Sequence, residues 1–252
     1  MNNILELKNV SKSFDGIKAV DALSLTVEKE TITSLIGPNG AGKTTLFNII
    51  TAFTSPDSGA IYHKNIDITN LKPHEIVKMG IIRSFQDLRL FSKLTVLDNV
   101  LSAIKDQYGE SFLEAAFSYG RKKTEQEKNK SKAMEYLNFV NLADKANSSA
   151  EDLSYGEQKL LSIARLLASE AELFLLDEPV SGLHTEEIEI VLQKIKELVK
   201  HCKTILLVEH NMEAVMGISD KVIVLDEGRV IASGKPAEIQ NNKEVIEIYL
   251  RT

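Results

Sequence analysis

The sequence predicts an α/β protein with a mostly parallel sheet, an N-terminal antiparallel β portion and an inserted helical segment. Three observations support this class. Continuous apolar strands such as Leu173 to Leu176 are typical of a sheet that is buried on both faces. Segments near the N-terminus alternate apolar and polar residues, as strands with one exposed face do. Between about residues 88 and 160 the apolar residues recur instead at helical spacing.

The N-terminal part is expected to form antiparallel strands. Residues 5–8 and 23–27 alternate in polarity, and Asp15-Gly16 between them is a turn signal. A compact apolar strand follows at Thr31 to Ile36. It runs into a glycine-rich turn and then a helix that begins near Gly42, so the glycines lie between a strand and a helix.

The middle of the chain is expected to be helical, and the α/β rhythm then returns. Apolar stripes mark helices at residues 96–104 and 133–140, and the polar stretch Arg121 to Lys132 between them predicts a solvated helix face. Strands follow at Leu173 to Leu176 and from Thr204. A final hairpin turns at Asp226-Glu227-Gly228. The prediction is one domain, 1–252, with an α/β core at 1–87 and 161–252 and a helical subdomain at 88–160.

Composition limits the classes of function. The chain of 252 residues has a net charge of -6, which gives no electrostatic reason to expect a nucleic acid as partner. Its one cysteine, Cys202, cannot form a disulfide within the chain. The start carries no signal-peptide pattern, and no apolar run reaches the 18 or so residues of a membrane span. We therefore expect a cytoplasmic chain whose role at a membrane, if any, depends on a partner.

The glycine-rich turn matches the phosphate-binding pattern G-x-x-x-x-G-K-[ST]. Its glycines let backbone N–H groups converge on phosphate oxygens at the start of a helix. Lys43 can reach the β- and γ-phosphates of ATP, and the Thr44 hydroxyl can ligate Mg²⁺. The predicted phosphate-binding residues are Gly37, Pro38, Asn39, Gly40, Ala41, Gly42, Lys43, Thr44 and Thr45.

Two carboxylates end the apolar strand at residues 173–176. Asp177 is in position to hold Mg²⁺ beside the phosphate loop, and Glu178, beyond the strand's end, can turn toward the γ-phosphate as general base for the attacking water. His210, at the end of the strand from Thr204, can donate a hydrogen bond to the same phosphate. Taken alone, two acidic residues capping a turn and a structural histidine remain alternatives.

Ser154 and Glu157 have the spacing of a capping box at the start of a helix, and by itself the segment Leu153–Gln158 predicts only that. The order and spacing of the phosphate loop, this segment, the Asp177-Glu178 strand and His210 together resemble the ABC ATPase family, over essentially the whole chain. That resemblance implies a P-loop NTPase fold and a second ATPase subunit. ATP would bind between the phosphate loop of one subunit and Ser154, Gly156 and Glu157 of the other.

The resemblance also implies roles for residues that carry no motif of their own. Phe14 looks like the aromatic that stacks on adenine, with core packing as the alternative, and Val20 is placed among the nucleotide-binding residues. Gln86 looks like the catalytic glutamine that contacts Mg²⁺ and links to the membrane partner. Two positions depart from the family pattern. Glu157 stands where Gln is more usual, and His184 stands where Asp is typical.

The segments Arg83–Phe91 and Glu244–Leu250 resemble the branched-chain amino-acid uptake group of this family. This implies partner permeases and a location at the inner face of the membrane. The solute would be bound by other subunits, not by this chain. An ABC ATPase of another system, such as lipid or lipopolysaccharide export, and a soluble non-transport ABC ATPase remain alternatives. So do a homodimer and a heterodimer with a paralogue.

Overall fold

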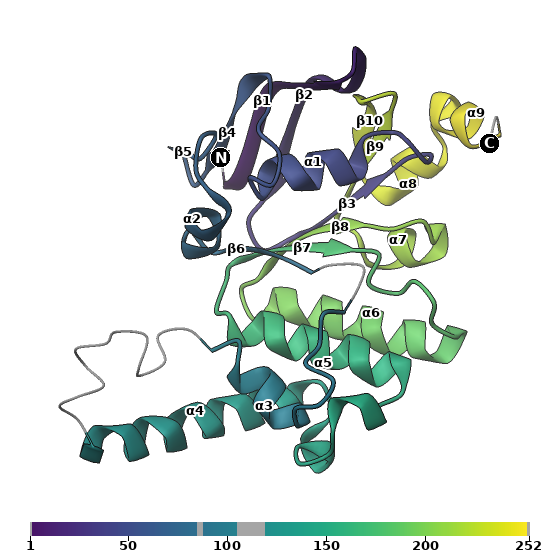
Figure 1. Cartoon of the computed structure of the whole chain (residues 1–252). Coiled ribbons are helices and arrows are strands. Elements are labelled where there is room, and N and C mark those ends of the chain that lie inside the picture. The colour runs from purple at the N-terminus through teal and green to yellow at the C-terminus, as the bar shows by residue number, and fades with distance from the viewer. Residues whose placement is uncertain (1, 85–87, 105–118, 251–252) are drawn as a thin grey trace. The chain divides into compact units, whose positions relative to one another are not determined.

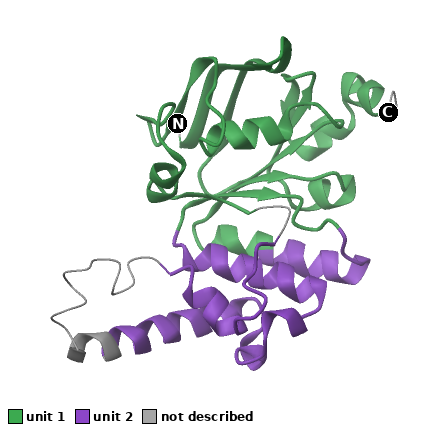
Figure 2. Ribbon diagram, viewed as in Figure 1, with its two compact units in different colours: residues 1–84, 171–181, 195–252 green, residues 85–170, 182–194 purple. Residues whose placement is uncertain are grey.

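The computed structural model describes residues 2–84, 88–104 and 119–250 (Figure 1). The chain divides into two compact units, which Figure 2 shows in green and purple. The first unit comprises residues 1–84, 171–181 and 195–252, and the second comprises 85–170 and 182–194.

The first unit contains a four-stranded antiparallel sheet in the order β2-β1-β4-β5. β1 and β2 pair along their length, and Asp15 and Gly16 connect them with positive φ angles of 49° and 85°. The predicted N-terminal antiparallel portion and its turn are therefore confirmed. The strands are β1 (Asn3–Phe14), β2 (Ile17–Glu28), β4 (Ser58–His63) and β5 (Ile66–Asp67).

The second sheet of this unit has six strands in the order β10-β9-β3-β8-β7-β6. All neighbouring pairs are parallel except β9 and β10, which form the predicted C-terminal hairpin. Every residue of the central β3, β7 and β8 is buried, as their continuous apolar sequences predict. The strands are β3 (Ile32–Ile36), β6 (Ile81–Arg83), β7 (Leu173–Asp177), β8 (Thr204–Val208), β9 (Lys221–Asp226) and β10 (Arg229–Gly234).

Helix α1 (Lys43–Ile50) lies between the two sheets (Figure 1). Its buried side chains Leu46, Phe47, Ile49 and Ile50 share one hydrophobic core with residues of both sheets, so the helix is covered on opposite sides. The short α2 (Pro73–Lys78) adds Ile76 to the same core. This packing fixes the start of α1 against the carboxyl ends of the parallel strands, where ligands of open α/β sheets bind.

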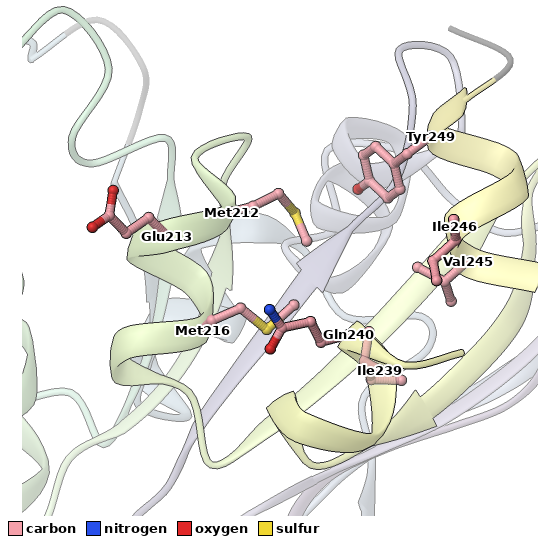
Figure 3. Close-up of a pocket in the computed structure, with 8 residues that line it drawn as sticks. All are labelled: Met212, Glu213, Met216, Ile239, Gln240, Val245, Ile246 and Tyr249. Atoms are coloured by element: carbon pink, nitrogen blue, oxygen red, sulfur yellow. The ribbon is translucent and has the colours of Figure 1, made fainter. Parts of the chain in front are cut away.

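A second hydrophobic core of this unit lies under its three C-terminal helices. Ile36 of β3 packs there with residues of β9, β10 and the helices. The helices are α7 (Met212–Ile218), α8 (Pro236–Gln240) and α9 (Lys243–Leu250). Together they line an open pocket of about 570 Å³ (Figure 3), formed by Met212, Glu213, Met216, Ile239, Gln240, Val245, Ile246 and Tyr249.

The second unit is helical. In α4 (Tyr119–Phe139) the predicted apolar stripe is confirmed, because Ala133 and Leu137 are fully buried, and Val140 follows the helix equally buried. The polar stretch from residue 124 to 132 is mostly exposed, as expected for a solvated face. The other elements are α3 (Val96–Leu101), the 3₁₀ turns η1 (Ala143–Lys145) and η2 (Ala150–Asp152), and α5 (Tyr155–Ala168).

The division between units differs from the predicted one at 88–160. Helix α5 is continuous from Tyr155 to Ala168, so a boundary at residue 160 would cut it, and the second unit runs to residue 170. That unit also takes residues 182–194, which include the first turns of α6 (Thr185–Lys200). Among the helices of the described ranges, none is both long and apolar enough to cross a membrane.

Candidate functional site

The glycine-rich turn connects β3 to α1, as predicted. Gly37 has a φ of +150°, and a β-carbon there would lie 2.1 Å from the Leu225 carbonyl oxygen. Gly42 has a φ of +99°, and its β-carbon would lie 2.3 Å from the carbonyl oxygen of Ala19. Both positions therefore need glycine, because another backbone segment occupies the space that a side chain would fill.

The first turn of α1 has no side-chain cap, since Gly42 occupies the N-cap position. A helix leaves its first backbone N–H groups without intrahelical partners, and these groups with the helix dipole favour an anion. The loop residues Asn39 and Gly40 are exposed, as is Thr44 at the start of the helix. The turn is thus open to a phosphate from the solvent side.

The Lys43 side chain is buried inside the loop. Its ammonium donates hydrogen bonds to the carbonyl oxygens of Gly37, at 2.7 Å, and Pro38, at 2.9 Å. Burial lowers the pKa of Lys43, and the negative charges of Glu178 and Asp177 act in the opposite direction. The Lys43 ammonium therefore interacts electrostatically with both carboxylates from its position inside the loop.

Asp177 ends β7 in a buried position. Its Oδ2 accepts a hydrogen bond of 2.6 Å from Arg83 of β6, and Arg83 also donates to Asn48 Oδ1 of α1 at 2.6 Å. Asp177 also donates its backbone N–H to the Ser84 hydroxyl. Arg83 was not predicted from the sequence to belong to the site. A charged residue closing a short apolar strand, Ile81-Ile82-Arg83, was the available signal.

Glu178 leaves the strand direction immediately after Asp177. Its φ is +48°, in the left-handed region, and its backbone N–H donates to the carbonyl oxygen of Val208 at 2.9 Å. The side chain thereby meets His210 from the end of β8: Nε2 of His210 lies 3.0 Å from Oε1 of Glu178. The side chain of Glu178 is 21% exposed and that of His210 is 44% exposed, so both are accessible from solvent.

The segment 154–158 lies in the second unit and forms the capping box that its spacing predicts. The Ser154 hydroxyl accepts from the Glu157 N–H, and the Glu157 carboxylate accepts from the Ser154 N–H. Glu157 also pairs with Lys145. Gly156 faces Glu187, where a β-carbon would lie 2.5 Å from Oε1. The Glu157 carboxylate is thus engaged at the helix start.

The remaining predicted residues occupy three kinds of position. Phe14 is 47% exposed, so it is not a core residue, and the Lys12 ammonium lies 5.5 Å from its ring centroid. Val20 is fully buried and its side chain packs in the hydrophobic core. Gln86 lies outside the described residues. The structure thus brings Lys43, Asp177, Glu178 and His210 together in the first unit and describes Ser154 to Glu157 in the second.

The C-terminal helix α9 also reaches the phosphate loop. Burial raises the pKa of Tyr249, and a hydrogen bond with the Gly37 backbone lowers it by less. Tyr249 forms one wall of the C-terminal pocket, and Met212, two residues after His210, forms part of another (Figure 3). The contact between α9 and the loop was not predicted from the sequence.

Comparisons with known proteins agree with the geometry. The sequence model of the family described as "ABC transporter" matches residues 20–181. A second one, described as "Branched-chain amino acid ATP-binding cassette transporter", matches residues 229–250.

Individual relatives match over nearly the full length. The probable branched-chain amino acid transport ATP-binding protein LivG of Archaeoglobus fulgidus is 40% identical, over 98% of this chain and 95% of that protein. The high-affinity branched-chain amino acid transport ATP-binding protein BraF of Pseudomonas aeruginosa is 38% identical, over 98% of this chain and 97% of that protein.

Solved structures share the fold. The ADP conformation of MJ1267, an ATP-binding cassette of an ABC transporter, superposes with a TM-score of 0.86 at 34% identity and covers 100% of both chains. The dimeric post-hydrolysis state of the cassette MJ0796, bound to ADP and Pi, gives a TM-score of 0.73 at 29% identity, over 92% of this chain and 98% of that one. With the phosphate loop and the carboxylate-bearing strand in place, this chain belongs to the ABC transporter ATP-binding family.

Proposed function

We propose that this chain binds ATP with Mg²⁺, hydrolyses it as one of a pair of subunits, and so drives uptake of branched-chain or related amino acids through partner permeases. The observation that carries the proposal is the contact between Glu178 and His210 at the ends of two neighbouring parallel strands, next to the Lys43 loop. That arrangement puts a base, a hydrogen-bond donor and a phosphate-binding cation at one edge of the sheet.

ATP binding is assigned to the loop from Gly37 to Thr45. The Lys43 ammonium already makes hydrogen bonds to loop carbonyls, and phosphate oxygens would replace these acceptors with charged ones. The backbone N–H groups at the start of α1 would bind the same oxygens. The exposed Phe14 ring is available to stack on adenine.

The residues fit a Mg²⁺ ion that is held mainly by phosphates. In the described part of the chain, no group of three or more His, Cys, Asp or Glu side chains could hold a metal by itself. Mg²⁺ in nucleotide sites characteristically uses one or two protein oxygens besides phosphate and water. The Asp177 carboxylate and the Thr44 hydroxyl supply these, and Gln86 is proposed to join them. When bound, the ion would neutralise charge that develops on the phosphates.

Hydrolysis needs a water molecule aligned with the γ-phosphate and little covalent chemistry from the protein. Glu178 is proposed to orient this water and accept its proton. His210 holds the Glu178 carboxylate at 3.0 Å and can donate to a γ-phosphate oxygen. Lys43 stabilises the phosphate charge from inside the loop.

The second half of the site is assigned to Ser154 and Gly156 of a second subunit, either another copy or a paralogue. In trans, the Ser154 hydroxyl and the start of α5 would bind the γ-phosphate across the nucleotide. Completion of a site by a second molecule is worth roughly 10³–10⁵ in rate in other phosphoryl-transfer enzymes. Such a chain would work at the inner face of the membrane, bound to its permeases, without contacting the solute.

The relatives named for branched-chain amino acid transport and the match at residues 229–250 favour this solute class over lipid export. Uptake of radiolabelled leucine tests the assignment in cells that lack the chromosomal gene and carry either the parent or Glu178→Gln. The parent should restore uptake and the variant should not. Equal leucine uptake with the parent, the variant and an empty vector would refute the assigned solute.

A further inference from the structure

Glu209 follows β8 directly and is almost completely buried, with 3% of its surface exposed. Its two carboxylate oxygens accept hydrogen bonds from backbone N–H groups on two separate chain segments. Oε1 accepts from Val180 at 3.0 Å, and Oε2 accepts from His210 at 3.1 Å and more weakly from Asn211 at 3.4 Å.

A buried carboxylate is costly unless its charge is compensated. In the described ranges no Lys, Arg or His side chain forms an ion pair with Glu209, so these backbone hydrogen bonds carry the compensation. The carboxylate therefore connects the two segments through these hydrogen bonds.

The two segments are those that carry the proposed base and its partner. Val180 stands two residues after Glu178, and His210 follows Glu209 itself. The backbone adds a second connection between the same strand ends, because the Glu178 N–H donates to the Val208 carbonyl at 2.9 Å. The two connections are therefore made at the N–H groups of Glu178 and Val180. Glu178 has its left-handed conformation there and contacts His210.

We propose that Glu209 is a positioning residue for ATP hydrolysis: by bridging the backbone after β7 and β8, it keeps the Glu178 carboxylate and the His210 ring in contact. This rests on the proposed ATPase function. The hydrogen bonds of the Glu209 carboxylate go to the segments after the two strands and not to the phosphate loop, so its contribution belongs to turnover and not to nucleotide binding.

The test is Glu209→Gln in the full-length chain. The amide keeps the volume of the carboxylate but has one acceptor oxygen, and its NH₂ group would face a backbone N–H on one of the two sides. One segment therefore loses its anchor whichever way the amide turns. We expect kcat to fall about tenfold to a hundredfold, the range that follows from losing hydrogen bonds to a charged group, with the dissociation constant for ATP within about threefold of the parent.

Two further variants make the result specific. Glu209→Asp keeps the charge but is one methylene too short to reach both segments, so it should lose kcat in the same way. Glu213→Gln removes the same charge from an exposed residue of α7 and should leave kcat and ATP affinity unchanged. Rates are normalised to the number of sites that bind ATP, which removes any loss of folded protein from the comparison.

Unchanged kcat in Glu209→Gln and Glu209→Asp would overturn the proposal, and so would an equal loss of ATP affinity and kcat. If Glu209→Gln binds no nucleotide, Glu209→Asp decides by the same criteria, and a failure of both to bind counts against a positioning role. A parent protein without ATPase activity in its paired state would instead refute the proposed function. The two failures are thus distinguishable.

Discussion

Nε2 of His210 lies 3.0 Å from Oε1 of Glu178, across the ends of two adjacent parallel strands. The contact depends on the left-handed backbone at Glu178, which turns this side chain away from the direction that a continuing strand would give it. A non-glycine residue with positive φ at a strand end is a strained arrangement that is found at functional sites. It places the proposed base where a neighbouring histidine can hold it.

Glu178→Gln should bind ATP as the parent does and hydrolyse it at least about a hundredfold more slowly, because the amide cannot accept the proton of the attacking water. Closed dimers should accumulate with ATP and be visible by size-exclusion chromatography. Glu189→Gln, on the exposed side of α6, is the matched control and should behave as the parent. Steady-state hydrolysis by Glu178→Gln within about threefold of the parent would remove Glu178 from the role of base.

Lys43→Ala should weaken ATP binding on the order of tenfold to a hundredfold, as expected for the loss of a charged hydrogen-bond donor to the phosphates. Titration with a fluorescent ATP analogue measures this change. Lys128→Ala, which removes an exposed lysine of α4, should leave the dissociation constant unchanged. An unchanged dissociation constant in Lys43→Ala would contradict the assignment of the phosphate loop.

Arg83→Lys should destabilise the first unit by about 1–3 kcal/mol, because one ammonium cannot replace the hydrogen bonds that the guanidinium makes to Asp177 and Asn48. Urea unfolding gives the free energy. Arg229→Lys is the control, because it alters an ion pair with Asp21 in which the arginine is 67% exposed. Its free energy of unfolding should not change measurably. Equal stability of the two variants would show that the buried pair does not hold the end of β7.

The capping box at α5 should make stability depend on acid pH. Burial raises the pKa of Glu157, but the Lys145 side chain and the Ser154 N–H lower it by more, so the net shift is downward. A carboxylate whose pKa is lowered in the folded state stabilises the protein at pH values above its unfolded-state pKa, near 4.5. This contribution is lost as the pH falls through the folded-state pKa.

Glu157→Gln keeps a capping acceptor and loses the ion pair with Lys145. Its urea midpoint should therefore lie below that of the parent at pH 7, and the difference should shrink below about pH 4.5. Lys145→Met removes the other partner of the ion pair, so its urea midpoint should also approach that of the parent below about pH 4.5. A difference between parent and Glu157→Gln that stays constant from about pH 7 to about pH 4 would contradict the shift.

Prediction from the sequence was strongest where a function needs a local pattern. The strand, glycine turn and helix around Lys43, the buried strand ending in Asp177, and the capping box at Ser154 all follow from residues close in the chain. It was weaker where partners are distant. Neither the pairing of Arg83 with Asp177 nor the reach of Glu209 to Val180 leaves a pattern at fixed spacing, because the fold alone brings these residues together.

Phe14 and Val20, both assigned to the nucleotide site by position, lie in different surroundings. Phe14 is exposed, so the alternative of core packing is wrong for it, whereas Val20 is buried in the core. The boundary at residue 160 stays a prediction, and α5 runs across it from Tyr155 to Ala168.

We propose that each ATP binds between Lys43 of one subunit and Ser154 of the other. Two copies are joined in one polypeptide, and both carry Glu178→Gln. The ATP that this linked pair retains distinguishes a site shared between subunits from a site within one subunit. With Lys43→Ala in one copy and Ser154→Arg in the other, one complete site remains if sites form between subunits. With both changes in the same copy, none remains.

Retained ATP after rapid gel filtration is the decisive measurement. If sites form between subunits, the linked pair with the changes in different copies retains ATP and the linked pair with both changes in the same copy loses it. The reverse result, retention only when both changes share a copy, would mean that each subunit builds its site alone and would rule out a site shared between subunits.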